Sequence, residues 1–263
     1  MPVAFASDAI REFSLTLDEI ESNLEFLRLS AILRPRLNGM LLWDSIQGDA
    51  RRLVTDFLNQ KSVELGPQFR GMIIVICGAF EHFVRRVVRE AVIKLNAGAN
   101  SFDNLHGELQ RQNVYRTGRA LTTIMQPLDH VNVDYSALAG NLATCVSGAT
   151  TFTLNADAFT LFFTGGKPEH LADILKSIGL TLDWDDFGRI SSFEGLLEAK
   201  GTRALGRAVS EHLLELMLLR NRLTHSGSGG ITVTDADVKR EIVFFRIFAP
   251  TLTAIVSKKI TGR

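Results

Sequence analysis

The sequence has little cysteine and no net charge, and both absences exclude classes of protein. Among its 263 residues are two cysteines, Cys77 and Cys145, and 29 basic residues balance 29 acidic ones. Two cysteines so far apart form neither a disulfide framework nor a pair of metal ligands. Balanced charge gives no strong overall field to attract nucleic acid or anionic lipid. A polyanion site would therefore need a local cluster, or one built by dimerisation.

Long apolar stretches and a secretion signal are also missing. The longest apolar run, Met72 to Phe80, is nine residues long and is followed by Glu81. A membrane span needs about 20 such residues, so a buried helix is the better interpretation. The N-terminus has no basic segment followed by an apolar one, as a secretion signal would. We expect a cytoplasmic protein with no membrane segment, which suits the sparse cysteines.

What the sequence does contain is apolar residues at three- and four-residue steps, the pattern of amphipathic helices. Helices are expected over about 7–33, 48–59, 69–95 and 202–224, with a last one from Thr234 onward. Pro35 is expected to end the first helix, and Pro250 to kink the last. Thr234 and Asp237 have the spacing of a capping box. The fold class expected is mainly all-α.

The middle third of the chain gives weaker signals. Residues 121–125 could form a short helix, and Thr150 to Phe163 could be extended because it is rich in Thr and Phe. Thr164 to Pro168 reads as a turn, and Pro168 to Ile178 as a short helix with proline in its first turn. We interpret residues 100–195 as a less regular insertion that elaborates the helical core and could hold short strands.

The end of the helix over 202–224 gathers residues suited to phosphodiester chemistry. An apolar stripe that includes Leu213 and Met217 leads to Arg220, and a guanidinium there is costly unless it is paired or lies in a cleft. Asn221 is four residues before His225 and shares its face, and a glycine-rich segment follows. Imidazole can move protons at neutral pH. Arginine can hold a phosphate and offset developing charge.

The spacing of Arg220 and His225 is not specific by itself. Arg207 and His212 are separated by the same number of residues. A plain structural role is also open, in which Arg220 pairs with a carboxylate and His225 lies favourably at a helix C-terminus. No motif for zinc, for nucleoside triphosphates or for a serine nucleophile occurs, so neither a metal nor a cofactor is expected.

The segment Leu216 to Gly227 resembles the Arg-Asn…His-(Gly/Ser) signature of the HEPN superfamily, whose helical domains are often ribonucleases. Ala79 to Arg85 resembles the Phe-Glu-x-Phe-x-Arg helix of the RiboL-PSP/MAE-type prokaryotic branch. The resemblance covers about 65–95 and 200–258. Thr224 and Ser226 depart from the small residue and the glycine that many members have beside the histidine.

The resemblance implies a HEPN-type antiparallel helical bundle, a single domain over 1–263 with the insertion at about 100–195. It implies a homodimer in which Arg220 and His225 of both protomers meet in one cleft, and a metal-independent endoribonuclease that acts through the RNA 2′-hydroxyl. Arg220 would bind or polarise the phosphate, His225 would be general base or acid, and Asn221 would orient the site. Toxins or antiviral effectors with an antitoxin or regulatory partner are common in such families.

Four further residues are candidates for binding RNA: Arg222, Thr224, Glu81 and Arg85. Glu81 could instead pair with Arg85, or be a buried carboxylate that positions Arg220. Arg85, Arg86 and Arg89 form either a solvated face or an RNA-binding strip.

His82 and His212 are expected to be surface or core residues, and the phenylalanines near residue 160 to be core. The alternative function is a catalytically silent HEPN module for dimerisation, nucleotide sensing or partner binding. A DNA-binding regulator lacks support, because no helix-turn-helix pattern or basic patch stands out.

Overall fold

The computed structural model describes residues 5–39, 52, 65–125, 133–149, 151–225 and 230–262, and within these ranges the chain is helical with no strand. Its α-helices are, in chain order, α1 (Ser7–Gly39), α3 (Leu65–Ala97), α4 (Gly107–Thr122), α5 (Tyr135–Val146), α6 (Ala156–Thr160), α7 (Pro168–Ser177), α8 (Asp185–Gly188), α9 (Glu194–Leu197), α10 (Thr202–His225) and α11 (Asp235–Thr261). Short 3-10 turns occur at Phe102–Asn104, Thr123–Met125 and Ser191–Phe193. None of these described helices is long and apolar enough to cross a membrane.

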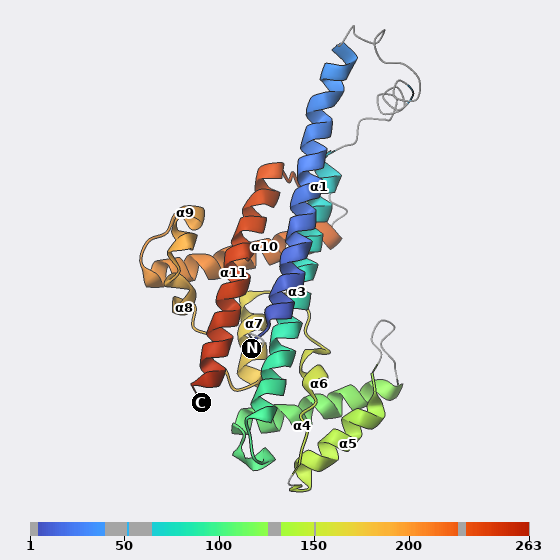
Figure 1. Cartoon of the computed structure of the whole chain (residues 1–263), viewed down its shortest axis with the longest axis vertical. Coiled ribbons are helices and arrows are strands. Elements are labelled where there is room, and N and C mark those ends of the chain that lie inside the picture. Colours follow the sequence, from blue (N-terminus) through green and yellow to red (C-terminus); the bar gives the residue numbers. More distant parts are fainter. Residues whose placement is uncertain are drawn as a thin grey trace.

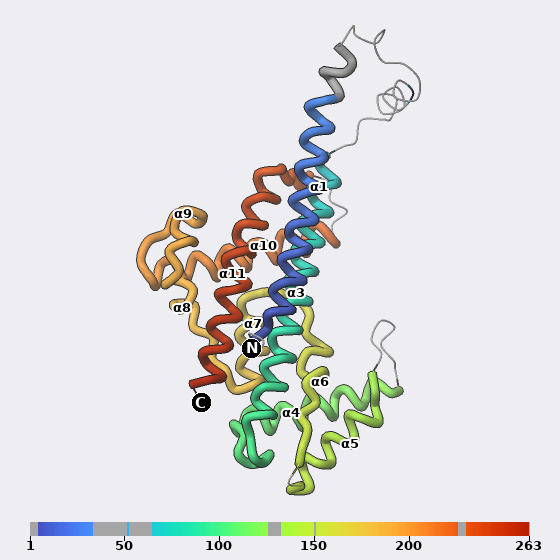
Figure 2. The backbone as a smooth tube through the Cα atoms, in the orientation of Figure 1, coloured from blue at the N-terminus to red at the C-terminus, as the bar shows by residue number. Residues whose placement is uncertain are grey.

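The helices α1, α3 and α11 lie alongside one another, and α10 crosses them (Figure 1). Ion pairs join α1 to α11, and their order along the two helices shows that the helices are antiparallel. Arg246 of α11 binds both Asp18 and Glu21 of α1, and Arg28, further along α1, binds Asp235 at the start of α11. The tube in Figure 2 shows the same arrangement, with both long partners of α1 running in the opposite direction. This agrees with the expected antiparallel bundle.

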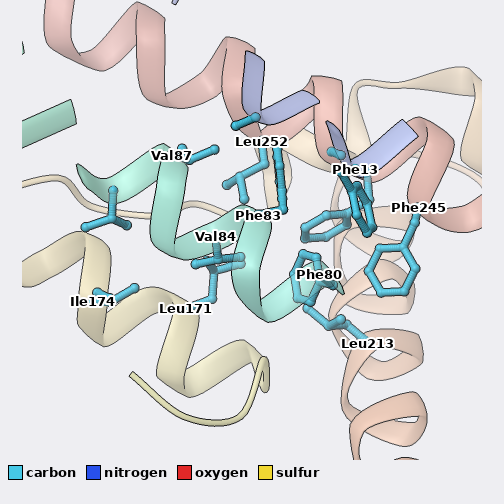
Figure 3. Packing of buried hydrophobic residues seen from close by; sticks show 14 of the residues in the cluster. Phe13, Phe80, Phe83, Val84, Val87, Leu171, Ile174, Leu213, Phe245 and Leu252 are labelled. Atoms are coloured by element: carbon cyan, nitrogen blue, oxygen red, sulfur yellow. The ribbon is translucent and has the colours of Figure 1, made fainter. Parts of the chain in front are cut away.

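Phenylalanines from three helices form the centre of the core. Phe80 of α3 contacts Phe13 of α1 and Phe245 of α11, with ring centroids 6.4 Å and 4.7 Å away. Figure 3 shows these rings together with Leu213 of α10 and, on the other side of α3, Leu171 of α7. The apolar stripes expected on α1 and α10 are buried. The core therefore fixes the crossing of α10 over α3, which is where the candidate site lies.

The first half of α10 packs backbone to backbone against α8. A Cβ at Gly206 would lie 2.4 Å from the carbonyl oxygen of Trp184, and one at Gly188 only 1.8 Å from that of Thr202. Only glycine permits so close an approach. The two glycines thus hold the start of α10 against α8, and the other end of the helix extends to the side where α3 begins (Figure 1).

The structure differs from the sequence expectations in three places. The helix α1 continues through Pro35 to Gly39, so Pro35 does not end it. Residues 151–163 contain α6 rather than an extended strand, because Ala156, Ala158 and Phe159 are buried together on a helical turn. Residues 121–125 are the end of α4 followed by a 3-10 turn. The helix expected over 48–59 lies outside the described residues, apart from residue 52.

Other expectations are confirmed. The helix α3 spans the region expected to be buried, and Gly66 and Pro67 fall in its first turn, where proline is tolerated. The helix α7 begins at Pro168. Thr234 caps α11, and Asp237 completes a reciprocal capping box with it. The helix α11 contains Pro250 in its interior, and the kink expected there stays a prediction.

Candidate active site at the end of α10

Arg220 lies where α10 crosses α3, and two side chains hold its guanidinium. Its Nη1 donates a hydrogen bond to Oδ1 of Asn221 at 3.1 Å. Its Nη2 lies 3.8 Å from Oε1 of Glu81 on α3, an ion pair longer than a hydrogen bond. The side chain of Arg220 is 27% exposed. The guanidinium is thus anchored but not fully occupied by its own chain.

Glu81 is buried, with 9% of its surface exposed. Its Oε1 and the Nε of Arg220 are both buried without a hydrogen-bond partner. Of the two partners considered for Glu81, Arg220 is the one it contacts. This contact and the burial favour a role for Glu81 in positioning Arg220 over direct binding of RNA. A buried carboxylate beside a guanidinium lowers the cost of burying either charge.

Arg85 makes a different contact. Its Nε and Nη2 donate to the carbonyl oxygen of Phe163, at 3.2 Å and 2.6 Å. It lines a separate cleft and is not part of the α10 site. The structure therefore does not bring Arg85 together with Arg220 and His225.

An open groove of about 820 Å³ runs beside the end of α10. Asn221, Arg222 and His225 all line it, and the last two are exposed. Arg220 is not among the described lining residues of this groove. In one chain, the guanidinium of Arg220 thus contacts Glu81 and Asn221, and His225 lines the groove.

Thr224 bonds to its own helix. Its hydroxyl donates to the carbonyl oxygens of Arg220 and Asn221, at 3.1 Å and 3.0 Å. Both bonds are local to the last turns of α10, so the hydroxyl of Thr224 is satisfied within its own helix. This contact accounts for a threonine at the position where many relatives of the signature have a small residue.

The sequence did not reveal three residues on the far wall of the groove: His212, Arg240 and Glu241. Nε2 of His212 lies 2.7 Å from Oε2 of Glu241, which is only 3% exposed. Oε1 of Glu241 accepts a hydrogen bond from Nε of Arg240 at 3.1 Å. His212 also packs on the ring of Phe244. His212 was expected to be a surface or core residue. No signal in the sequence indicated that its partner would be Glu241, which is 29 residues away on α11.

Cys77 lies among the charges beneath the site. Burial raises the pKa of its thiol, and the carboxylates of Glu241 and Glu81 raise it further against the opposing effect of Arg220. The thiol therefore stays protonated and is a packing residue in the folded protein. No group of three or more His, Cys, Asp or Glu side chains placed to hold a metal is found in the described part of the chain.

Comparison with known proteins gives one finding. The family model described as RiboL-PSP-HEPN matches residues 49–257, which is most of the chain and includes α3, α10 and most of α11. No curated protein and no solved structure matches the chain. The matched span contains Glu81 on α3 and the whole motif at the end of α10. The helical fold and this match together show that the chain belongs to the RiboL-PSP-HEPN family.

Proposed function

We propose that this protein is a metal-independent endoribonuclease whose site includes Arg220, Asn221 and His225. HEPN domains are commonly dimeric and act on RNA. The observation that carries the proposal is the end of α10, where Asn221 both holds Arg220 and lines an open groove with His225. An arginine, which can bind phosphate, and an imidazole, which can transfer protons, thus lie at the same end of one helix.

The reaction proposed needs only the RNA and the protein. The 2′-hydroxyl loses a proton to His225 of one protomer and attacks the adjacent phosphorus, so that a 2′,3′-cyclic phosphate forms and the bond to the 5′-oxygen breaks. An imidazolium, the partner's His225 in a dimer, returns a proton to that oxygen. Arg220 offsets the negative charge on the phosphoryl oxygens in the transition state. Asn221 keeps the guanidinium in place.

The site is completed by a second copy of the chain in this proposal. In one chain His225 lines the groove, whereas the guanidinium of Arg220 contacts Glu81 and Asn221, which supports a site that a second protomer completes. A two-fold pairing of the α10 ends would bring two arginines and two histidines together. We further propose a role as a toxin or antiviral effector, held in check by an antitoxin or another regulatory protein.

The test is an RNA cleavage assay with the purified full chain and mixed RNA in excess EDTA. Wild-type protein is expected to cleave, and His225→Ala to lose at least about 100-fold in rate, since general acid–base catalysis contributes about 10²–10⁴. His82→Ala is the matched control, because His82 is an exposed histidine on α3 that pairs with Glu12 and does not line the α10 groove. Cyclic phosphate ends on the products would identify the 2′-hydroxyl as nucleophile.

A catalytically silent module is the second candidate. The contacts of Arg220 with Glu81 and Asn221 favour this alternative, because they explain the position of the arginine without a role in RNA binding. Absence of cleavage over diverse RNAs, from a protein that is a stable dimer, would establish this alternative and refute the first. Equal cleavage by His225→Ala and wild type would likewise refute the proposed site.

A further inference from the structure

A second cleft lies apart from the α10 groove and shares no residue with it. It has a volume of about 710 Å³, and it is lined by α3, by α5 and by the segment 153–161 that contains α6. In Figures 1 and 2, α6 lies beside the C-terminal half of α3, and α4 and α5 lie below it. The volume is within the range of about 300–1,000 Å³ that small-molecule sites occupy.

Arginines of α3 form one wall of this cleft. Arg85, Arg86 and Arg89 all line it, because residues at these spacings share one side of a helix. Arg86 pairs with Glu12, and Arg89 pairs with Asp157, whose side chain is 74% exposed. Exposed pairs of this kind are worth about 0–1 kcal/mol and open at little cost. The two outer arginines can therefore turn to another anion.

Arg85 differs from its neighbours because no carboxylate neutralises it. Its guanidinium is partly buried, and the contact it makes is with the carbonyl oxygen of Phe163, through Nε and Nη2. No Asp or Glu of the described residues lies within ion-pair distance of it. A carbonyl dipole offsets only part of the cost of taking a cation out of water. The guanidinium of Arg85 is thus a positive charge that the Phe163 carbonyl keeps in place at the wall of the cleft.

The opposite wall is apolar and firmly held. Ala137 and Leu138 of α5 and Leu161 after α6 contribute to it. Behind it, the buried amide of Asn155 donates to the hydroxyl of Thr117 and to the carbonyl oxygen of Leu138, at 3.1 Å and 2.9 Å. These bonds tie α4, α5 and the start of α6 together, so the cleft is preformed. Asp134, which also lines it, is occupied as the N-cap of α5.

We propose that this cleft binds a small organic phosphate of about nucleotide size. The phosphate would bind Arg85, with Arg86 and Arg89 beside it, since guanidinium groups match phosphate oxygens in pairs. The body of the molecule would pack on the apolar wall formed by α5 and Leu161. The limited volume of the cleft, and Arg85 as its one described arginine without a carboxylate partner, fit one small anion rather than a polyanion strand. The site is independent of the proposed nuclease chemistry, because a mononucleotide has no internucleotide bond to cleave.

The test is calorimetric titration of the full chain with AMP, with inorganic phosphate and adenosine as partial ligands. Arg85→Gln removes the charge and is expected to weaken AMP binding at least about tenfold, as the loss of a charge-assisted hydrogen bond does. Ala137→Trp is the second variant. Ala137 is exposed at the cleft, so tryptophan there fills the space without disturbing the core. Arg207→Ala, at an 80% exposed arginine of α10, is the matched control.

The expected result is AMP binding to wild type and to Arg207→Ala, weakened in both cleft variants, and tighter than binding of phosphate or of adenosine alone. Absence of AMP binding to wild type would overturn the proposal. Binding that neither cleft variant weakens would also overturn it, as would a short RNA competing for the cleft where AMP does not. A thermal melt of each variant separates lost binding from lost folding.

Discussion

At the scale of the residue, the central feature is a guanidinium that is anchored and still available. Arg220 has one nitrogen bonded to Asn221 and another near Glu81, and its Nε has no hydrogen-bond partner. A guanidinium has five N–H donors. The Nε of Arg220 is buried, but the side chain is 27% exposed, so N–H groups of its two terminal nitrogens remain for a phosphate. Glu81 is thus a positioning residue in our proposal, acting on RNA only through Arg220.

Glu81→Gln tests that role. Removing the charge is expected to destabilise the fold by up to about 3 kcal/mol, since breaking a buried pair leaves the other charge uncompensated. It is also expected to lower kcat for RNA cleavage about tenfold or more with a smaller change in KM, because the misplaced guanidinium fails chiefly in the transition state. Urea unfolding and steady-state kinetics measure the two effects.

Glu90→Gln on the same helix is the control for Glu81, because Glu90 is not among the buried residues of α3. If the two variants match in stability, Glu81 has no anchoring role. If they match in kcat while only stability differs, Glu81 is structural alone.

At the scale of the element, α10 depends on glycine at one end and on a helix crossing at the other. Its first half touches the backbone of α8 at Gly206, and its last turn meets α3 through Arg220 and Glu81. The adjoining α11 starts at a capping box of Thr234 and Asp237. These local features determine the positions of the side chains of α10 and α11 that line the groove.

Gly206→Ala is expected to destabilise the protein by about 1–3 kcal/mol, because its Cβ would clash with the Trp184 carbonyl and force the helices apart. Gly78→Ala in α3 is the matched control. Nothing lies within 4 Å of a Cβ there, so alanine should stabilise by about 0.5–1 kcal/mol through helix propensity. Urea midpoints compare the two. The same sign of effect for both would contradict the close approach.

The capping box of α11 gives a pH-dependent prediction. Burial by itself would raise the pKa of Asp237, but hydrogen bonds from the hydroxyl and the N–H of Thr234 lower it below the ordinary value of 3.8. The carboxylate therefore stabilises the fold above about pH 4, and this contribution is lost as the pH falls through the lowered pKa. Asp237→Asn should cost about 0.5 kcal/mol at pH 7, since the group is partly exposed.

The measurement is urea unfolding of Asp237→Asn and wild type from pH 2 to pH 7, where the difference should shrink toward acid. Asp173→Asn on the exposed face of α7 is the control. A difference for Asp237→Asn that grows toward acid would have the wrong sign for a lowered pKa.

At the scale of the whole molecule, the family match and the geometry of one chain support a composite site. The chain belongs to the RiboL-PSP-HEPN family, and in one chain His225 lines the groove while the guanidinium of Arg220 contacts Glu81. In our proposal the assembly, rather than the overall charge of the chain, creates the local positive site. The second cleft, in contrast, is complete within one chain.

A mixing experiment tests the composite site. Arg220→Ala and His225→Ala chains are each expected to be inactive, and after co-refolding the mixed dimers would hold one intact arginine and one intact histidine. RNA cleavage by the mixture should exceed that of either variant alone and stay below that of wild type, because the mixed dimer keeps only one of the two histidines. Solution mass by light scattering is the accompanying control, and a strict monomer at the assay concentration would refute the composite site.

The sequence by itself determined the helical fold class, the long helices α3, α10 and α11, the Thr234 capping box and the motif at the end of α10. These follow from local signals: apolar periodicity, capping spacing and a short motif in its helix. Pro35 shows the limit of such signals, because α1 continues through a residue that usually ends a helix. Residues 151–163 show it too, because their helical turn depends on burial against other elements.

Only the tertiary structure decided which side chains meet. Glu81 could have paired with Arg85 four residues away, but the crossing of α10 over α3 gives it Arg220, 139 positions further along the chain. A second contact between distant residues places His212 of α10 on Glu241 of α11 at the edge of the groove. Helix periodicity fixes which residues share a face. The partner of that face depends on core packing, which joins residues distant in sequence.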